Sequence, residues 1–568
     1  EIYTLHIVGS GQMCIRDRYI PTTGQGYTGY FTLQKQHLMK KKKVTTYCCL
    51  LLLASFFTTV TAQNTNTPMM GWSSWNTFRV HINEELIKET ADAMVNRGLK
   101  DVGYGYVNID DGYFGGRNSE GRLFANKKKF PNGMRVLSDY IHSKGLKAGI
   151  YSDAGSNTCG SIYDADTLGI GVGLWKHDDI DCQTFLKDWG YDFIKIDWCG
   201  GEATGQSEQQ RYTDIYKAIR RTGRTDVRYN ICRWQFPGTW ATQLAGSWRI
   251  HTDINPRFTT IDRIIERNLY LAPYASPGHY NDMDMLEVGR GLTEDEEKTH
   301  FGIWSILSSP LMIGCDLRTI PEKTLSIITN KEVIALNQDS LGLQAEAIER
   351  GKDYLILSKA IQKREGKLRA VALYNRSNTD QQIRVDFDKL YLSGDVRVRD
   401  LWNHQEMGTF TDYYETLVPA HGTALIRLEG SKRHDRTCYE AEYAFMQEFL
   451  PDNKQAAHFT PKSGASGEYI MKNLGNSPSN WAEFRNVYIS KGGDYQLKLT
   501  YYSGDKRDIQ IAVNGTEYKQ SNLYSGTWDQ AATTTIKVKL RKGYNTIRLY
   551  NSYGWAPDID KMEIIKGR

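Results

Sequence analysis

The sequence predicts an α/β chain: a (β/α)8 barrel, then an antiparallel β-sandwich domain, then a C-terminal all-β jelly-roll module. Three observations predict this order. Short apolar segments alternate with helical patterns over residues 63–343, in units of roughly 35 residues. From residue 344 the pattern changes to apolar–polar alternation, which is typical of antiparallel strands. Short strand patterns recur once more from residue 438 to the end.

Eight barrel strands are expected, with helical stretches in most of the gaps between them. Asn83 can cap the first helix, 84–97, which has an apolar stripe. In a TIM barrel the chemistry lies at the C-terminal ends of the strands, and the acidic residues of this segment cluster there. The expected strands are residues 69–75, 106–110, 148–153, 193–197, 228–232, 247–252, 279–284 and 310–314.

The remaining boundaries follow from composition. We expect the β-sandwich over residues 344–430, a linker at 431–437 and the last β-module over 438–568. The linker begins Ser-Lys-Arg, a short polar stretch between two strand-rich regions.

The first 62 residues are expected to lie outside the mature protein. Residues 1–38 have no packing pattern and are expected to be a non-native upstream segment. Met39 opens a secretory signal at 39–62, with four lysines, an apolar run and small residues before the cut. A membrane anchor is the alternative, but the apolar run is short and contains threonines. We therefore expect export and no stable membrane span in the mature chain.

Charge and cysteine content narrow the functional class. Residues 1–62 carry seven basic and two acidic residues, which accounts for the whole formal net charge of +5. Nothing therefore indicates a nucleic-acid partner. Six cysteines remain after residue 62, without the CxxC spacing of a zinc site. Export makes a disulfide feasible, and we expect one bridge with several buried thiols.

The fourth strand ends in the most informative pair of residues. Lys195 and Asp197 are two positions apart, so both side chains point to the same face of the strand. A carboxylate held ionised beside an ammonium suits the nucleophile of a glycosidase. An ordinary ion pair at a strand end is the alternative.

Other strand ends add further charged groups. The second strand ends in Asp110-Asp111, the sixth carries Arg249 with Asp253 four residues later, and the seventh leads to Asp284. A glycosidase needs at least two carboxyl groups facing each other across the barrel mouth. One must be ionised and the other protonated. Lys195 assigns the ionised role to Asp197, which leaves Asp253 as acid/base. A metal site is the competing explanation, although two cations lie inside the cluster.

Five motifs in this order resemble glycoside hydrolase family 27, the α-galactosidase and α-N-acetylgalactosaminidase family. The resemblance covers about residues 67–429. The motifs are Gly-Trp-Ser-Ser-Trp-Asn (71–76), Ile-Asp-Asp-Gly-Tyr (109–113), Gly-Ile-Tyr-Ser-Asp (149–153), Lys-Ile-Asp-Trp-Cys (195–199) and Asn-Asp-Met-Asp-Met-Leu (281–286).

The resemblance implies a retaining hydrolase that needs no cofactor for catalysis and acts on galactose-containing oligo- or polysaccharides. Asp197 matches the nucleophile and Asp253 the acid/base. Cys159 and Cys199 match a family disulfide. Asp110 and Asp111 would take the 4- and 6-hydroxyls of the sugar. The positions that match sugar-binding residues are Trp75, Asp110, Asp111, Tyr151, Lys195, Arg249 and Asp284.

One position departs from the family pattern. Cys232-Arg233-Trp234 stands where an acceptor such as Glu often contacts the sugar 2-position, and arginine cannot accept a hydrogen bond. Arg233 is expected to donate to the 2-hydroxyl, to pair with a neighbouring acid or to reach the next subsite. It also fills space that an N-acetyl group needs. β-L-arabinopyranosidase, α-N-acetylgalactosaminidase and a non-catalytic galactose-binding protein stay as alternatives to α-galactosidase.

The last module resembles carbohydrate-binding modules of families 6 and 35, on the basis of an early Glu-x-Glu and a late Asp. Such modules often hold a structural calcium. Glu440, Glu442 and Asp560 are oxygen ligands of the right kind for it. The alternative is a β-sandwich that only packs on the enzyme.

Overall fold

The computed structural model describes residues 66–567. The expected upstream segment and signal sequence lie outside the described residues. Among the residues that are described, no helix is both long and apolar enough to cross a membrane.

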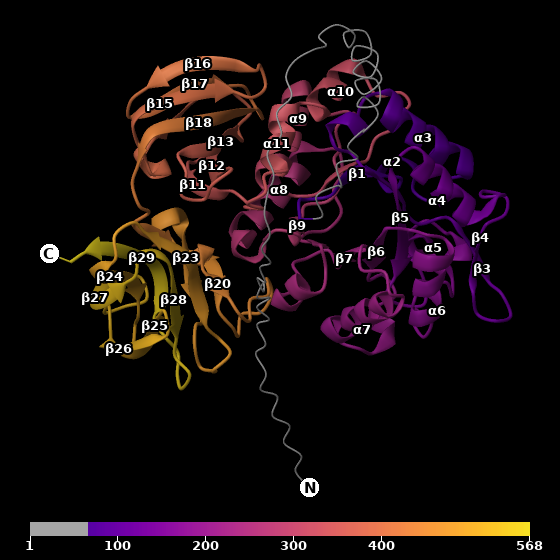
Figure 1. The fold of residues 1–568 in the computed structure, drawn as a ribbon. Helices are drawn as coiled ribbons and strands as arrows, with labels where there is room; N and C mark the ends of the chain where they lie inside the picture. Colours follow the sequence, from indigo (N-terminus) through magenta and orange to yellow (C-terminus); the bar gives the residue numbers. More distant parts are fainter. Residues whose placement is uncertain (1–65, 568) are drawn as a thin grey trace, which may run out of the picture. The chain divides into compact units, whose positions relative to one another are not determined.

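All eight expected barrel strands are present and pair in parallel. Figure 1 labels β1, β5, β6, β7 and β9 among them. The sheet has the order β10-β1-β2-β5-β6-β7-β8-β9. It closes where Leu286, just after β9, pairs in parallel with Ile313 of β10. The fold prediction is confirmed. The strands are β1 Met70–Ser73, β2 Tyr106–Ile109, β5 Lys147–Asp153, β6 Phe193–Asp197, β7 Arg228–Cys232, β8 Ser247–Arg249, β9 Tyr280–Asp282 and β10 Leu311–Ile313.

Helices connect these strands and bury their apolar faces against the sheet. Asn83 caps α3 as predicted, since its side chain accepts a hydrogen bond of 2.8 Å from Leu86 N. The helices are α2 Trp75–Phe78, α3 Glu84–Asn96, α4 Gly133–Ser143, α5 Cys159–Tyr163, α6 Asp178–Gln183, α7 Glu208–Arg221, α8 Phe258–Asn268, α9 Glu294–Ile306, α10 Glu322–Ile328 and α11 Lys331–Asn337.

Two local features differ from the expectation. β8 ends at Arg249 and β9 at Asp282, so the carboxylates that follow them lie in loops. A hairpin of β3, Phe114–Arg117, and β4, Leu123–Ala125, follows β2. Between β7 and β8, where no helix was expected, the chain has a short 3-10 helix, Thr239–Gln243.

An antiparallel β-sandwich follows the barrel. Its larger sheet has the order β11-β12-β13-β18-β15-β16, and β14 pairs with β17 in the second sheet. Ile356, Val371, Ile383 and Val385 belong to the core between the sheets. β18 continues to Arg433, so strand pairing extends into the expected linker. The strands are β11 Glu346–Arg350, β12 Tyr354–Ala360, β13 Leu368–Asn375, β14 Gln381–Asp386, β15 Leu392–Asp400, β16 Gln405–Phe410, β17 Tyr413–Val418 and β18 Thr423–Arg433.

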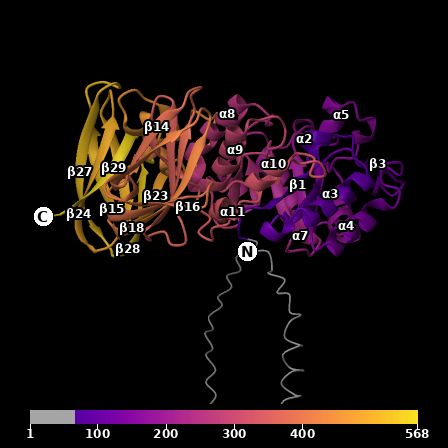
Figure 2. The same cartoon turned by 90° about the horizontal axis from the view of Figure 1, so that it is seen from above.

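The C-terminal module consists of two antiparallel sheets, β21-β22-β29-β24-β27 with β19 beside β29, and β20-β23-β28-β25-β26. The strands β24, β27 and β29 lie side by side (Figure 2). The strands are β19 Cys438–Glu440, β20 Phe445–Met446, β21 His458–Pro461, β22 Tyr469–Lys472, β23 Ala482–Ile489, β24 Gly493–Tyr502, β25 Arg507–Val513, β26 Thr516–Leu523, β27 Ala531–Leu540, β28 Gly543–Tyr550 and β29 Asp558–Lys566.

The module packs directly on the barrel. Phe445, Met446 and Phe449 belong to the same apolar core as the barrel residue Tyr274. The Tyr274 hydroxyl also donates to the backbone oxygen of Met446 at 3.3 Å. Shared apolar burial therefore fixes the module against one side of the barrel.

Candidate active site

The end of β6 places Lys195 and Asp197 together, as predicted. Lys195 Nζ lies 3.0 Å from Asp110 Oδ2 and 3.6 Å from Asp197 Oδ2. The parallel register pairs Lys195 with Tyr151 on β5, and the ammonium lies 5.3 Å from the centre of the Tyr151 ring. Burial opposes the charge on Lys195, but Asp110 and Asp197 outweigh it and raise the pKa of Lys195.

The two carboxylates after β2 have different partners. Asp110 Oδ2 accepts from Lys195, so this carboxylate belongs to the charged cluster. Asp111 accepts from the backbone amides of Gly112 at 2.8 Å and Gly160 at 2.7 Å. Burial raises the pKa of Asp111 to about 7. Asp111 therefore also orients the start of helix α5 beside the site.

Arg249 connects the two loop carboxylates across the barrel mouth. Its guanidinium lies 2.7 Å from Asp284 Oδ2 and 3.0 Å from Asp253 Oδ1. Asp284 has a left-handed backbone with φ of 79°, a conformation that costs energy in a residue with a side chain. Ile254 N donates to Asp284 Oδ2 at 2.8 Å, which fixes the loop that carries Asp253.

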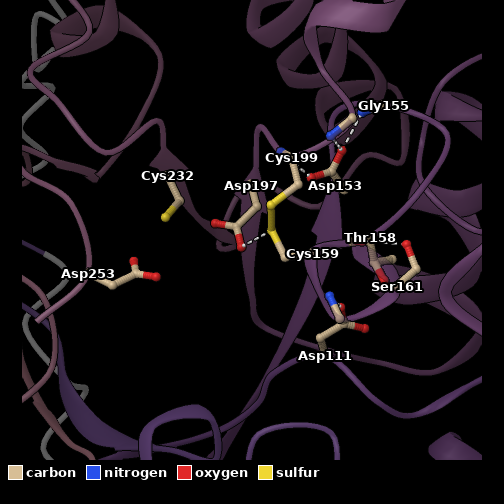
Figure 3. Close-up of a disulfide and its surroundings, with 12 residues drawn as sticks. Asp111, Asp153, Gly155, Thr158, Cys159, Ser161, Asp197, Cys199, Cys232 and Asp253 are labelled. Atoms are coloured by element: carbon tan, nitrogen blue, oxygen red, sulfur yellow. Dashed lines mark hydrogen bonds between the residues drawn. A yellow bond between two sulfur atoms is a disulfide. The ribbon is translucent and has the colours of Figure 1, made fainter. Parts of the chain in front are cut away.

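The expected disulfide, Cys159–Cys199, is present beside Asp197, and Cys182, Cys232, Cys315 and Cys438 are free. Figure 3 shows the carboxylate of Asp197 lying between this disulfide and Cys232, with Asp253 across the gap. Asp197 Oδ2 is 3.2 Å from the sulfur of Cys159. Asp153, at the end of β5, accepts from the backbone amides of Cys199 at 2.7 Å and Gly200 at 2.9 Å. The loops after β5 and β6 are thus tied together behind Asp197.

The pKa values of the two central carboxylates are shifted in opposite directions. Burial raises the pKa of Asp197 to about 6, although Lys195 acts in the opposite direction. Asp253 has 64% of its side chain exposed. Partial desolvation at the barrel mouth opposes its charge, but Arg249 and Lys195 outweigh this and lower the pKa of Asp253. Burial is thus the larger effect on the pKa of Asp197, and Lys195 favours its ionised form.

A cavity of about 260 Å³ opens over these groups. It is lined by predicted residues, though not by the buried Asp110, Asp111 and Tyr151, and by several residues that the sequence did not single out. Among the latter, Arg79 lies 4.6 Å over the Trp75 ring, and Tyr163 has 69% of its surface exposed. The lining side chains are Trp75, Asn76, Arg79, Cys159, Tyr163, Lys195, Asp197, Cys199, Trp234, Arg249, Asp253, Asp284 and Met285.

Arg233 does not line this cavity. Its Nε donates to Glu208 of α7, which matches the expected pairing with a neighbouring acid. The next residue, Trp234, lines the cavity instead and has a left-handed backbone with φ of 62°. Arg233 therefore does not fill the space that was expected to exclude an N-acetyl group.

Three carboxylates form a second charged cluster, in the C-terminal module. Ser466 bridges two of them: its hydroxyl donates to Glu440 at 2.7 Å and its amide donates to Asp560 at 2.9 Å. Glu440 and Glu442 each bury one oxygen without a hydrogen-bond partner. Burial, reinforced by Glu440 and Asp560, raises the pKa of Glu442 to about 9. Burial and Glu440 raise the pKa of Asp560 to about 6.

The three carboxylates are not packed as tightly as ligands around an ion. Within the described part of the chain, one set of acidic and sulfur atoms lies mutually within 4.8 Å, namely Asp153, Cys159 and Cys199. Both of those sulfurs belong to the disulfide, so they are not available as thiolate ligands.

The barrel mouth therefore combines a buried carboxylate, an exposed carboxylate facing it, and a ring of charged and aromatic groups around a sugar-sized cavity. Such a pair can act by nucleophilic attack and proton transfer on a glycosidic bond.

Comparison with known proteins agrees with this chemistry. The family model described as alpha galactosidase A matches residues 67–339, and that of the alpha galactosidase C-terminal beta sandwich domain matches residues 354–428. Alpha-galactosidase 2 of Arabidopsis thaliana is 41% identical over 372 residues, which are 64% of this chain and 90% of that protein. Alpha-galactosidase A of Cellvibrio japonicus is 38% identical over 392 residues, 64% of this chain and 93% of that protein.

Two solved structures show the same architecture over about two thirds of the chain. Alpha-galactosidase I from Mortierella vinacea has a TM-score of 0.61 and 34% identity, over 66% of this chain and 100% of that one. The GH27 β-L-arabinopyranosidase from Geobacillus stearothermophilus has a TM-score of 0.58 and 26% identity, over 64% of this chain and 97% of that one.

Proposed function

Because this chain belongs to the alpha-galactosidase family of glycoside hydrolases, GH27, we propose that it is a retaining enzyme that releases terminal α-linked galactose from oligo- or polysaccharides. The observation that carries the proposal is the pair Asp197 and Asp253, which face each other across the cavity at the barrel mouth. Galactose without its 6-carbon is arabinopyranose, so β-L-arabinopyranosidase is the second candidate. The carboxylates proposed for the 4- and 6-hydroxyls, Asp110 and Asp111, favour galactose.

In the proposed mechanism a carboxylate oxygen of Asp197 attacks the anomeric carbon as the bond to the leaving oxygen breaks. Asp253 gives its proton to that oxygen, and a covalent glycosyl-enzyme ester forms. Asp253 then removes a proton from water, which attacks the anomeric carbon and releases Asp197. Two inversions give net retention. A substrate over Asp253 removes water from its exposed carboxylate, and this desolvation moves the pKa upward, toward the protonated form that the first step needs.

Three nitrophenyl glycosides test the proposal: α-galactoside, β-L-arabinopyranoside and α-N-acetylgalactosaminide. We expect release mainly from the α-galactoside, with the α-anomer of galactose as the first product by NMR. Release confined to the arabinoside would overturn the substrate assignment, and no release from any of the three would overturn the enzyme assignment.

The acidic side of the pH profile should report Asp197. A protonated carboxyl cannot attack, so kcat/KM for nitrophenyl α-galactoside should fall about tenfold per pH unit below about pH 6. Lys195→Met removes the charge that lowers this pKa, so the acidic limb should move to higher pH. The exposed lysine Lys217 provides the matched control, Lys217→Met, which should leave the limb in place. If the acidic limb stays at the same pH in Lys195→Met, the assignment of that limb to Asp197 is contradicted.

We also propose that Glu440, Glu442 and Asp560 hold a structural calcium. A divalent cation would relieve the unpartnered buried oxygens of Glu440 and Glu442 and the mutual repulsion of the three carboxylates. Carboxylates are ligands that calcium prefers. The proposal requires the three side chains to close around the ion. It concerns stability, not the chemical step.

Calcium should raise the Tm and EDTA should lower it. At a hundredfold excess over Kd the gain is about 2.7 kcal/mol. Without metal, the folded pKa of Glu442, about 9, lies above its ordinary value of 4.5. The stability that the protonated Glu442 carboxyl contributes to the folded protein is fully present below about pH 4.5. It is lost as the pH rises toward 9. Calcium should cancel that loss. Glu442→Gln should abolish the calcium effect, and the exposed control Glu517→Gln should keep it. Equal Tm values with calcium and with EDTA would exclude the site.

We further propose that the protein is exported, since the disulfide beside Asp197 suits an oxidising compartment. The sugar-binding role of residues 438–568 is likewise a proposal.

A further inference from the structure

A second cavity, of about 500 Å³, lies between the barrel and the C-terminal module. We call it the module groove. Trp234 lines both the module groove and the active-site cavity. His251 and Thr252, directly before Asp253, also line the module groove. The groove therefore begins on the side of the active site where Asp253 lies.

The C-terminal module contributes aromatic side chains to this groove. Phe449, Phe459 and Tyr469 line it and contact barrel aromatics. The Tyr270 ring centre lies 4.9 Å from that of Phe459 and 4.6 Å from that of Tyr469. Phe449 stacks on Phe459 with ring centres 5.1 Å apart. These contacts hold the rings in fixed positions, so the groove exists before any ligand binds.

Polar groups complete the lining. Arg263 and Arg267 of helix α8 and Lys454 of the module are exposed. Glu266 is paired with Arg350 at 3.0 Å and with Arg376. An aromatic surface with donors around it suits a neutral saccharide, because pyranose rings offer apolar C–H faces and a rim of hydroxyls. The volume lies within the range of about 300–1,000 Å³ typical of ligand sites.

We propose that the module groove binds the leaving-group part of the substrate, as a set of saccharide subsites beyond the one next to the cleaved bond. This inference rests on the proposed function. Asp253 protonates the leaving oxygen, so a groove that begins beside Asp253 receives the sugar chain attached to that oxygen. The preferred substrate is then a galactosyl group on an oligosaccharide long enough to reach Phe459 and Tyr469.

The test compares two substrates on the full chain. Nitrophenyl α-galactoside ends at the nitrophenyl ring, whereas a galactosyl manno-oligosaccharide with several mannose units extends into the groove. Tyr469→Ala should lower the ratio of kcat/KM for the oligosaccharide to that for the nitrophenyl substrate roughly tenfold. Phe459→Ala should lower the same ratio. Tyr469→Trp, which keeps an aromatic face, should restore most of it.

Tyr544→Ala is the matched control, because Tyr544 is a 40% exposed tyrosine of the same module outside the groove. In Tyr544→Ala the ratio of the two kcat/KM values should equal that of the unmodified protein. An unchanged ratio in Tyr469→Ala and Phe459→Ala, with both proteins folded by their Tm, would overturn the inference while the nitrophenyl activity still supports the proposed function. Absence of nitrophenyl release in the unmodified protein would instead count against the proposed function itself. Equal losses on both substrates would mean that the rings only support the fold.

Discussion

Asp197→Asn should lower kcat for every galactoside by at least about 10⁴-fold, because the amide cannot form the covalent intermediate. The effect should be the same for activated and unactivated leaving groups, since the missing atom is the attacking one. Asp197 is 5% exposed, and burial already disfavours its charge. The neutral, isosteric amide should therefore fold with an unchanged or slightly higher Tm.

A small external nucleophile distinguishes loss of the attacking carboxylate from general damage to the site. Azide can occupy the space that a smaller residue leaves in Asp197→Gly and attack the anomeric carbon of nitrophenyl α-galactoside. The product should be the β-galactosyl azide, with inverted configuration. Normal turnover in Asp197→Asn would show that another group is the nucleophile.

Asp253→Ala should slow turnover of an oligosaccharide about 10²–10⁴-fold, the contribution expected of a general acid. The decrease in the rate of the first step should be much smaller for nitrophenyl α-galactoside, because nitrophenolate leaves without full protonation. The second step loses its base with either substrate. Stopped-flow measurement should therefore show a burst of nitrophenolate followed by a slow steady state.

Azide also tests the role of Asp253, and here the expected product has the opposite anomeric configuration. It should accelerate the steady state of Asp253→Ala by attacking the glycosyl-enzyme and should give α-galactosyl azide. Arg249 keeps Asp284 as a partner at 2.7 Å in this variant, so the remaining charges stay paired. A uniform loss on both substrates, without a burst, would contradict an acid/base role.

The barrel could be predicted from the sequence because its strands are apolar runs that end in charged residues. Lys195 and Asp197 lie within a regular strand, so the two-residue period fixed their common face. The Asn83 cap was predictable for the same reason, since capping depends on residues close in sequence.

The parts that could not be predicted lie where regular structure ends. Beyond β7 the alternation stops, and the left-handed backbone at Trp234 turns that side chain, in place of Arg233, toward the cavity. The pKa of Asp197 depends on burial by many distant segments, which a local pattern does not contain. The module groove joins Trp234 to Tyr469, residues far apart in the chain, and no sequence period relates them.

The Cys159–Cys199 bridge has a practical consequence for making this enzyme. It spans a sequence separation of 40 residues, for which loop-closure entropy predicts roughly 4 kcal/mol of stabilisation. Material produced in a reducing cytosol would keep the apolar barrel core but would lose the tie between the loops that flank Asp197. The yield of soluble protein would then overstate the yield of working enzyme, and specific activity should rise on reoxidation without any change in concentration.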